Sequence, residues 1–311
     1  MAKAAKSTAS FGRRNVTILK NEKVVRDMGM LRKGSTVAIV ACSNVLSKEQ
    51  FGQVGKAAQM LLEMGLRTKI APYMYGEEKN VPAKVRAAVL MEYFMDSGVQ
   101  AIFDASGGDV ANEVLEHLDF AAISKASKPF FGYSDLTVLL NALYAKMGNV
   151  SYYYQLRNLA GEKGKEQQEW FYQTLLEGKN TLFDIGFEFV QGERVQGIVL
   201  GGNMRCMLKL AGTPYWPDMD GKILLLESWG GRMELVRAWA AQYRQMGVFE
   251  QVKGIILGTF SHIEKQGQLS ELYKVVQENA GELPIVKTNE IGHGQDARCI
   301  AIGGEVDVSF Y

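Results

Sequence analysis

The chain carries almost no excess charge, and this scarcity excludes whole classes of protein. Its 311 residues include 35 Lys and Arg against 34 Asp and Glu, giving a formal net charge of +1. Without blocks of Lys or Arg, this balance gives no electrostatic reason to expect nucleic acid or an anionic membrane as a partner. No apolar stretch approaches the ~18 residues of a membrane span, and the N-terminus lacks the apolar core of a secretory signal. We therefore expect a soluble protein that is not exported.

Cysteine is also scarce, because the chain contains only Cys42, Cys206 and Cys299. Their odd number, wide spacing and lack of a CxxC pair argue against a disulfide framework and against a zinc knuckle. This usage fits a reducing compartment, so we expect a cytoplasmic protein.

Only three histidines are present, at His117, His262 and His293, so any mechanism that needs an imidazole has three candidates. Their isolation, without HxxxH spacing or clustered carboxylates, predicts no metal site. No GxxxxGK[ST] phosphate loop occurs. The segment Gly292–Ala297 matches GxGxxA, but a strand follows it where a dinucleotide fingerprint would open a helix. We expect neither a metal nor an organic cofactor.

What the chain does have is a repeated alternation of short apolar runs with longer segments of helical period. Six runs are apolar on both faces: Thr36–Ala41, Ala101–Ala105, Pro129–Tyr133, Gly197–Leu200, Lys222–Leu226 and Gly254–Leu257. Runs of this kind are typical of parallel strands covered by helices on both sides. The intervening helices have clear ends, such as the capping box of Ser47 and Gln50 that opens a helix closing at Gly65. The sequence therefore predicts an α/β fold.

Composition also divides the chain. Residues 1–29 are rich in basic and small polar residues and predict an extended leader. The stretch from Leu156 to Asn180 is rich in Gly, Glu, Gln and Lys and cannot supply a core strand. We therefore predict an N-terminal domain of residues 30–160, a linker of 161–194 and a C-terminal domain of 195–311. The alternating segment Cys299–Phe310 predicts an edge strand or a hairpin.

Candidate catalytic residues are sought where the apolar strands end, because sites in open α/β sheets form at the carboxyl ends of strands. Ser134 lies between an apolar strand and a helix, with Gly132 two residues before it. This position resembles a nucleophile elbow, where backbone N–H groups can stabilise an oxyanion. The alternative is an ordinary N-cap serine, and the second glycine of GxSxG is missing. Spacing alone leaves both the nucleophile and the N-cap interpretation of Ser134 open.

Two further strand ends have a functional and a structural interpretation. Gly107 and Gly108 could bring backbone N–H groups close to a ligand, or could form a tight turn. Glu227 ends an apolar strand, and its carboxylate is either solvated at the rim or kept to orient a histidine.

The histidines differ in their surroundings. His293 lies between two glycines, which suits an imidazole that must reach across a cleft. His262 also follows a strand and is a second candidate. His117 lies on an amphipathic helix, where a histidine is typically a surface residue or one whose hydrogen bonds are satisfied within the helix.

Several ordered motifs carry a resemblance that extends from about Leu31 to the C-terminus. They are KGSTVAIVACS, SGGDVANEVLEHLD, KPFFGYSDLTVLL, GGNM, GTPYWPDMDGKILLLES, GVFEQVKGIILGTF and IGHG. Together they resemble the LD-carboxypeptidase family of serine peptidases, which includes muramoyl-tetrapeptide carboxypeptidases and microcin-immunity hydrolases. Departures at Ala41-Cys42-Ser43, at Ser106–Val110 and around Tyr153-Tyr154-Gln155 fall in segments that would line the cleft.

The resemblance implies roles and a fold. Ser134 would be the nucleophile, His293 the base and Glu227 the residue that orients it. The family fold has a flavodoxin-like parallel-sheet N-terminal domain and a smaller β-rich C-terminal α/β domain, with the active site in the cleft between them. Family members commonly pair as homodimers, so a homodimer is expected here.

The expected activity is that of a serine L,D-carboxypeptidase that releases a terminal D-amino acid from a cell-wall-derived tetrapeptide, a small peptide substrate. The N–H groups of Gly108 and Asp135 would bind the oxyanion, and Gly107 and Asn203 would contact substrate. One alternative is a hydrolase of peptidyl-nucleotide antibiotics, with Trp170 stacking on a base. Another is a catalytically silent protein that binds muropeptides.

Overall fold

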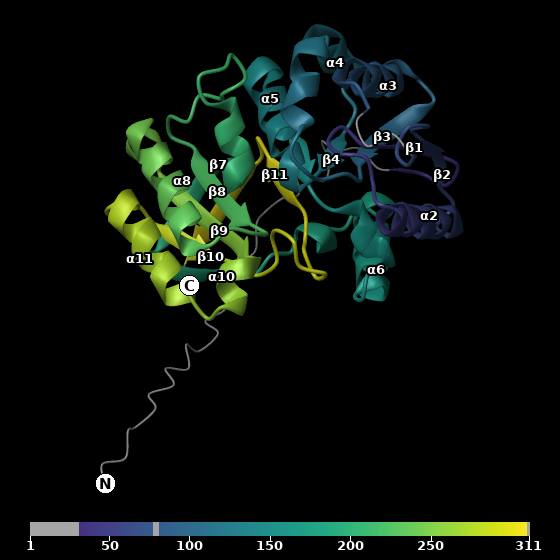
Figure 1. The fold of residues 1–311 in the computed structure, drawn as a ribbon. Helices are drawn as coiled ribbons and strands as arrows, with labels where there is room; N and C mark the ends of the chain where they lie inside the picture. The colour runs from purple at the N-terminus through teal and green to yellow at the C-terminus, as the bar shows by residue number, and fades with distance from the viewer. Residues whose placement is uncertain (1–30, 77–80, 310–311) are drawn as a thin grey trace.

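The structure is a computed structural model that describes residues 31–76 and 81–309. The predicted leader of residues 1–29 lies outside these ranges. The described chain forms two α/β halves, each built on a six-stranded sheet (Figure 1). The predicted α/β fold is confirmed.

The first sheet has the order β11-β5-β4-β3-β1-β2. Its strands are β1 (Thr36–Val40), β2 (Arg67–Ile70), β3 (Val99–Asp104), β4 (Phe130–Gly132), β5 (Ser151–Tyr153) and β11 (Ile300–Ile302). Strands β1 to β5 are parallel, and β11 runs antiparallel to β5. The order 2-1-3-4-5 is that of flavodoxin-like folds, in which ligands bind outside the carboxyl ends of the strands.

Helices alternate with these strands as the pattern predicts. They are α2 (Lys48–Glu63), α3 (Ala83–Met95), α4 (Phe120–Ala126), α5 (Thr137–Met147) and α6 (Gly164–Leu175), with short 3₁₀ helices η1 (Ala111–His117), η2 (Ser134–Leu136), η3 (Leu156–Ala160) and η4 (Thr181–Phe183). Helix α2 starts at the predicted capping box, since the Ser47 side chain accepts from Gln50 N and the Gln50 side chain accepts from Ser47 N.

The second sheet has the order β12-β7-β8-β9-β10-β6. Its strands are β6 (Glu188–Gln191), β7 (Arg194–Asn203), β8 (Ile223–Ser228), β9 (Gly254–Phe260), β10 (Ile285–Lys287) and β12 (Glu305–Ser309). Its helices are α7 (Met204–Met207), η5 (Leu208–Leu210), α8 (Met233–Gln245), α9 (Val248–Gln251), α10 (Ser261–Lys265) and α11 (Leu269–Ala280). Strands β7 to β10 are parallel, and the two edge strands are antiparallel.

The C-terminal segment contributes an edge strand to each sheet. Strand β11 pairs with β5 of the first sheet, whereas β12 pairs with β7 of the second. Figure 1 shows β11, in yellow, lying beside the teal half of the molecule. In the segment predicted as an edge strand or a hairpin, Ile300–Ile302 and Glu305–Ser309 therefore form edge strands. The hairpin alternative is wrong because the two strands pair with different sheets. The chain from β10 to β11 must cross between the halves.

Strands β2, β5 and β6 were not predicted from the sequence. Strand β2 has alternately exposed residues, β6 has one exposed and three half-buried residues, and β5 has only three residues. Strand β6 lies within the segment predicted as a linker and pairs with β10. None of the three has the continuous apolar pattern of the central strands.

Candidate active site

Ser134 is the first residue of η2 and lies on a strained turn after β4. Its φ of 54° is in the left-handed region, which is costly for a residue with a Cβ and is typical of nucleophile elbows. Its N–H donates to the Tyr153 hydroxyl over 2.9 Å, and its carbonyl accepts from Thr137 Oγ1 over 2.6 Å. Tyr133 occupies the cap position of η2, and no capping bond from a side chain is present there. The N-cap interpretation of Ser134 is therefore wrong.

Glu227 and His293 form a buried pair. The Glu227 side chain is 0% exposed, and its Oε2 lies 2.7 Å from His293 Nδ1. His293 is on the crossover between β10 and β11, and its backbone N–H donates to Thr259 Oγ1. Its neighbour Gly292 has a φ of 124°, and a Cβ there would come within 2.8 Å of Glu227 Oε2 and 2.2 Å of Thr259 Oγ1. A glycine at 292 thus permits the pairing.

The other Glu227 oxygen is held by two donors. Oε1 accepts from the Tyr153 hydroxyl over 2.8 Å and from Asn203 Nδ2 over 2.9 Å. Asn203 and Glu227 are register partners at the carboxyl ends of β7 and β8. Burial, and then the nearby Glu227 carboxylate, raise the pKa of Tyr153 well above its usual value, so this hydroxyl stays protonated and donates. The network fixes the Glu227 side chain with one oxygen facing the imidazole.

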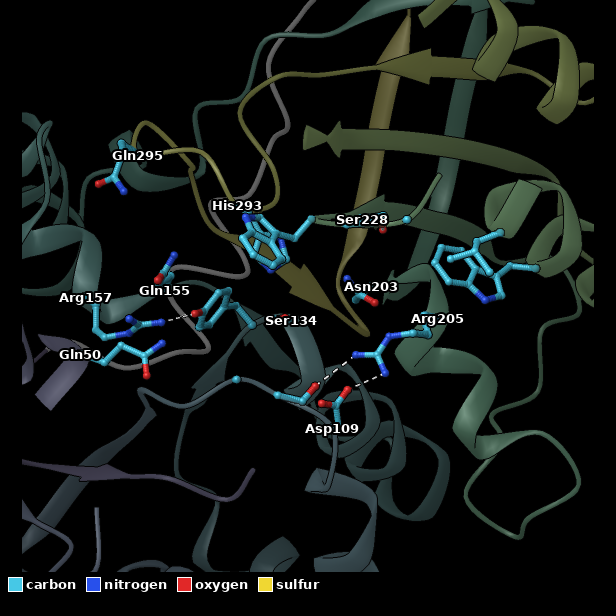
Figure 2. Close-up of a pocket in the computed structure, with 18 residues that line it drawn as sticks. Gln50, Asp109, Ser134, Gln155, Arg157, Asn203, Arg205, Ser228, His293 and Gln295 are labelled. Atoms are coloured by element: carbon cyan, nitrogen blue, oxygen red, sulfur yellow. Dashed lines mark hydrogen bonds and ion pairs between the residues drawn. The ribbon is translucent and has the colours of Figure 1, made fainter. Parts of the chain in front are cut away.

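Ser134 and His293 line one pocket of about 590 Å³ between the two halves (Figure 2). Its other lining residues are Gln50, Gly107, Gly108, Asp109, Tyr133, Gln155, Arg157, Asn203, Arg205, Ser228, Trp229, Gly230, Gly231, Leu235, Trp239 and Gln295. Among the described residues, no hydrogen bond joins Ser134 Oγ to the imidazole. The two groups share the pocket, and Figure 2 shows both among the residues that line it.

The predicted oxyanion residues lie beside the nucleophile. Gly108 has a φ of 135°, and a Cβ there would meet Asn44 Oδ1 at 2.3 Å, so only glycine fits. The Asp135 side chain is buried and turned away from the pocket, accepting from Ser43 Oγ and Ala111 N. Asp135 is the second residue of η2, directly after Ser134.

Other residues considered from the sequence lie outside the pocket. His262 is on the exposed surface of α10, and His117 lies near Glu116 on η1. Trp170 lies under the Arg298 guanidinium, 3.5 Å from ring centroid to Cζ. The structure therefore removes Trp170 as a residue that stacks on substrate in this pocket.

Three residues of the site were missed by sequence reasoning: Tyr153, which holds Glu227, and Arg157 and Trp229, which line the pocket. Trp229 follows Glu227 by two positions at the same strand end, and its side chain is 67% exposed. A search of the strand ends for aromatic as well as ionisable residues would have found it. Tyr153 carries no such signal, because its role depends on how β5 pairs, and Arg157 lies on η3, away from the strand ends.

Within residues 31–76 and 81–309, no group of three or more His, Cys, Asp or Glu is placed to hold a metal ion. In the same ranges, no helix has the length and apolar character needed to cross a membrane.

A serine, a buried glutamate and a histidine around a cleft between two α/β halves are the arrangement that serine hydrolases use. Comparison with known proteins agrees with this class. The N-terminal domain of LD-carboxypeptidases matches residues 37–154, and their C-terminal domain matches residues 196–308. The chain belongs to the LD-carboxypeptidase family, and it is a serine-type carboxypeptidase.

Individual relatives cover most of the chain. A Bacillus subtilis protein named probable murein peptide carboxypeptidase is 26% identical over 88% of this chain and 89% of its own. The structure of the microcin C7 self-immunity protein MccF, known from Escherichia coli, is 20% identical with a TM-score of 0.78, covering 91% of this chain and 97% of that one. Muramoyltetrapeptide carboxypeptidase from Oxalobacter formigenes is 22% identical with a TM-score of 0.70, covering 89% and 99%. Both structures share the fold.

Proposed function

We propose that the chain is an L,D-carboxypeptidase that releases the terminal D-amino acid from a cell-wall-derived tetrapeptide by means of Ser134, His293 and Glu227. The observation that carries the proposal is the 2.7 Å contact of the buried Glu227 carboxylate with His293 Nδ1, in a pocket that Ser134 also lines. The substrate class is supported by the names of the relatives, two of which refer to murein peptides or muramoyltetrapeptide.

In the proposed reaction, His293 Nε2 takes the proton of Ser134 Oγ as this oxygen attacks the carbonyl that joins an L-centre to the terminal D-residue. The Glu227 carboxylate accepts from Nδ1–H, which fixes the tautomer and stabilises the imidazolium. The imidazolium then gives its proton to the leaving amine, and the D-amino acid departs. Water attacks the acyl-enzyme, with His293 again as base, and restores Ser134.

The oxyanion would be stabilised by the N–H groups of Gly108 and Asp135. The Ser134 N–H is already used by the Tyr153 hydroxyl, which leaves these two neighbours as the donors. Donors fixed by backbone before the reaction cost no reorganisation when charge develops on the oxygen.

The test is incubation of the purified protein with murein tetrapeptide, followed by mass spectrometry. We expect release of one D-amino acid and accumulation of the tripeptide, and loss of both with Ser134→Ala. A reactive-serine probe should label Ser134 in the wild type. An intact tetrapeptide together with an unlabelled Ser134 would favour the silent muropeptide-binding protein instead.

A second candidate is hydrolysis of peptidyl-nucleotides, favoured by one observation. Trp229 presents an exposed ring on the pocket wall, with ring centroids 6.4 Å from His293. Such a ring could stack on a base, since base–aromatic stacking is sequence-tolerant and worth about 1–3 kcal/mol. An aminoacyl-adenylate analogue in the same assay, with Trp229→Ala as the variant, separates the two candidates.

A further inference from the structure

One wall of the pocket carries the cationic side chain of Arg157. Arg157 lies on η3, and its side chain is only 9% exposed. Its Nη1 donates to Gln53 Oε1 over 3.1 Å, and its Nη2 donates to the Tyr133 hydroxyl. Its Nε has no hydrogen-bond partner among the described residues. Buried charges are normally paired, because an uncompensated one costs several kcal/mol.

The partners of Arg157 do not compensate it. Gln53 is neutral, and burial raises the pKa of the Tyr133 hydroxyl, so it stays neutral as well. Within the described residues, Arg157 forms no ion pair with a carboxylate. Figure 2 shows amide side chains around it, from Gln50 and Gln155.

The other pocket cation, Arg205, differs in this respect. Its Nη1 lies 2.7 Å from Asp109 Oδ1, and its Nη2 donates to the Gly108 carbonyl. Arg205 is thus neutralised locally, whereas Arg157 is not. In Figure 2 the Arg205–Asp109 pair and Arg157 lie on different sides of Ser134.

The guanidinium of Arg157 is also close to the nucleophile. Tyr133, whose hydroxyl it contacts, directly precedes Ser134. Both the Tyr133 hydroxyl and Ser134 Oγ lie next to Gly107, since a Cβ at Gly107 would be 3.5 Å from the hydroxyl and 3.9 Å from Oγ. In a carboxypeptidase substrate, the terminal carboxylate is only about one residue length, roughly 3.5 Å, from the scissile carbonyl. Arg157 and Ser134 line the same pocket, so an anion bound by Arg157 would lie in the cavity that holds the nucleophile.

We propose that Arg157 binds the terminal carboxylate of the leaving D-amino acid and so restricts the enzyme to the last residue of a peptide. This inference rests on the proposed carboxypeptidase function and adds the residue that makes it an exopeptidase. A guanidinium holds a carboxylate through parallel N–H donors, which a neutral amide end group does not match.

The experiment compares a tetrapeptide with the same peptide carrying a C-terminal carboxamide. Turnover is measured with wild type, Arg157→Gln, Arg157→Lys and the matched pocket variant Arg205→Gln. Binding is measured by calorimetry in a Ser134→Ala background, so that affinity is read without turnover. Thermal melts check that each variant is folded.

We expect the wild type to prefer the carboxylate in kcat/KM and in affinity by about 10- to 100-fold, the range of a charged hydrogen bond. Arg157→Gln should abolish the preference, Arg157→Lys should retain part of it, and Arg205→Gln should retain it in full. A folded Arg157→Gln that keeps the preference would overturn the proposal while leaving the carboxypeptidase activity intact. Failure of the wild type to cleave or bind either peptide would overturn the proposed function, and this inference with it.

Discussion

The two walls of the cleft hold their catalytic candidates by different means. On the wall of the first sheet, Ser134 is placed by its backbone, with a left-handed φ of 54° and its N–H and carbonyl both hydrogen-bonded. On the wall of the second sheet, His293 and Glu227 are placed by side chains, through a buried network with Tyr153 and Asn203. A backbone-held group keeps its position when its own side chain is changed, whereas a side-chain network is altered by the loss of any member.

This difference predicts how variants on each wall should behave. Substitutions of the nucleophile should remove activity and leave stability unchanged. Substitutions in the network should affect both, because they leave buried polar groups without partners.

The largest effect is expected for Ser134→Ala. The loss of Oγ removes the attacking atom, so kcat should fall by on the order of 10³-fold or more. Alanine keeps the backbone contacts of Ser134 to Tyr153 and Thr137, so the melting temperature should stay close to that of the wild type. Steady-state kinetics with the tetrapeptide and a thermal melt provide the two measurements. Retained activity would rule out the nucleophile assignment.

His293→Ala should reduce kcat to a comparable extent, because no other imidazole lines the pocket within the described residues. His262→Ala is the matched control, since His262 lies on the exposed surface of α10. It should change kcat by less than about two-fold, in the range of surface substitutions. An essential His262 would show that the base was assigned to the wrong loop.

Glu227→Gln should lower kcat by roughly 10²-fold or more, with KM close to the wild-type value. Tyr153 and Asn203 both donate to Oε1, and His293 Nδ1–H donates to Oε2, so all three partners require an acceptor. A Gln side chain must present its NH₂ group to one of them, which also lowers the free energy of unfolding by about 1–3 kcal/mol. Nitrogen-15 NMR of His293 would report a loss of the Nδ1–H tautomer. A variant that keeps most of its kcat would make Glu227 purely structural.

Much of this arrangement could be predicted from the sequence, because the strand ends carry it. The apolar runs predict parallel strands, and the carboxyl ends of parallel strands meet at one edge. Ser134 and Glu227 each end such a run, so their roles were accessible to local reasoning, although the family resemblance was needed to favour them over the N-cap and rim alternatives.

The remainder depends on pairing that no local pattern encodes. His293 is favoured over His262 because its loop joins β10 of the second sheet to β11 of the first. This loop therefore runs from one half to the other. Tyr153 is the middle one of three consecutive tyrosines. Its selection follows from the β4–β5 register, in which Tyr153 pairs with Gly132 and Tyr152 pairs with Phe131.

The smallest effect is expected for Tyr153→Phe, which removes a hydroxyl that links the two walls. Its loss leaves the Ser134 N–H unpaired and removes one donor to Glu227, while Asn203 Nδ2 remains. We expect kcat to fall by about 10-fold and the free energy of unfolding by about 1–3 kcal/mol.

The matched control for this variant is Tyr154→Phe, which removes an equally buried hydroxyl bonded to Gln167 outside the pocket. It should lower stability and leave kcat near the wild-type value.

The pH dependence sharpens the contrast. Because the pKa of Tyr153 is raised above its usual value of about 10, the phenol remains neutral throughout pH 8–10 and its ionisation removes no activity there. The kcat profiles of wild type and Tyr153→Phe should therefore be parallel from pH 8 to pH 10. An alkaline fall seen only in the wild type would mean that Tyr153 ionises in this range and does not serve as a fixed donor to Glu227.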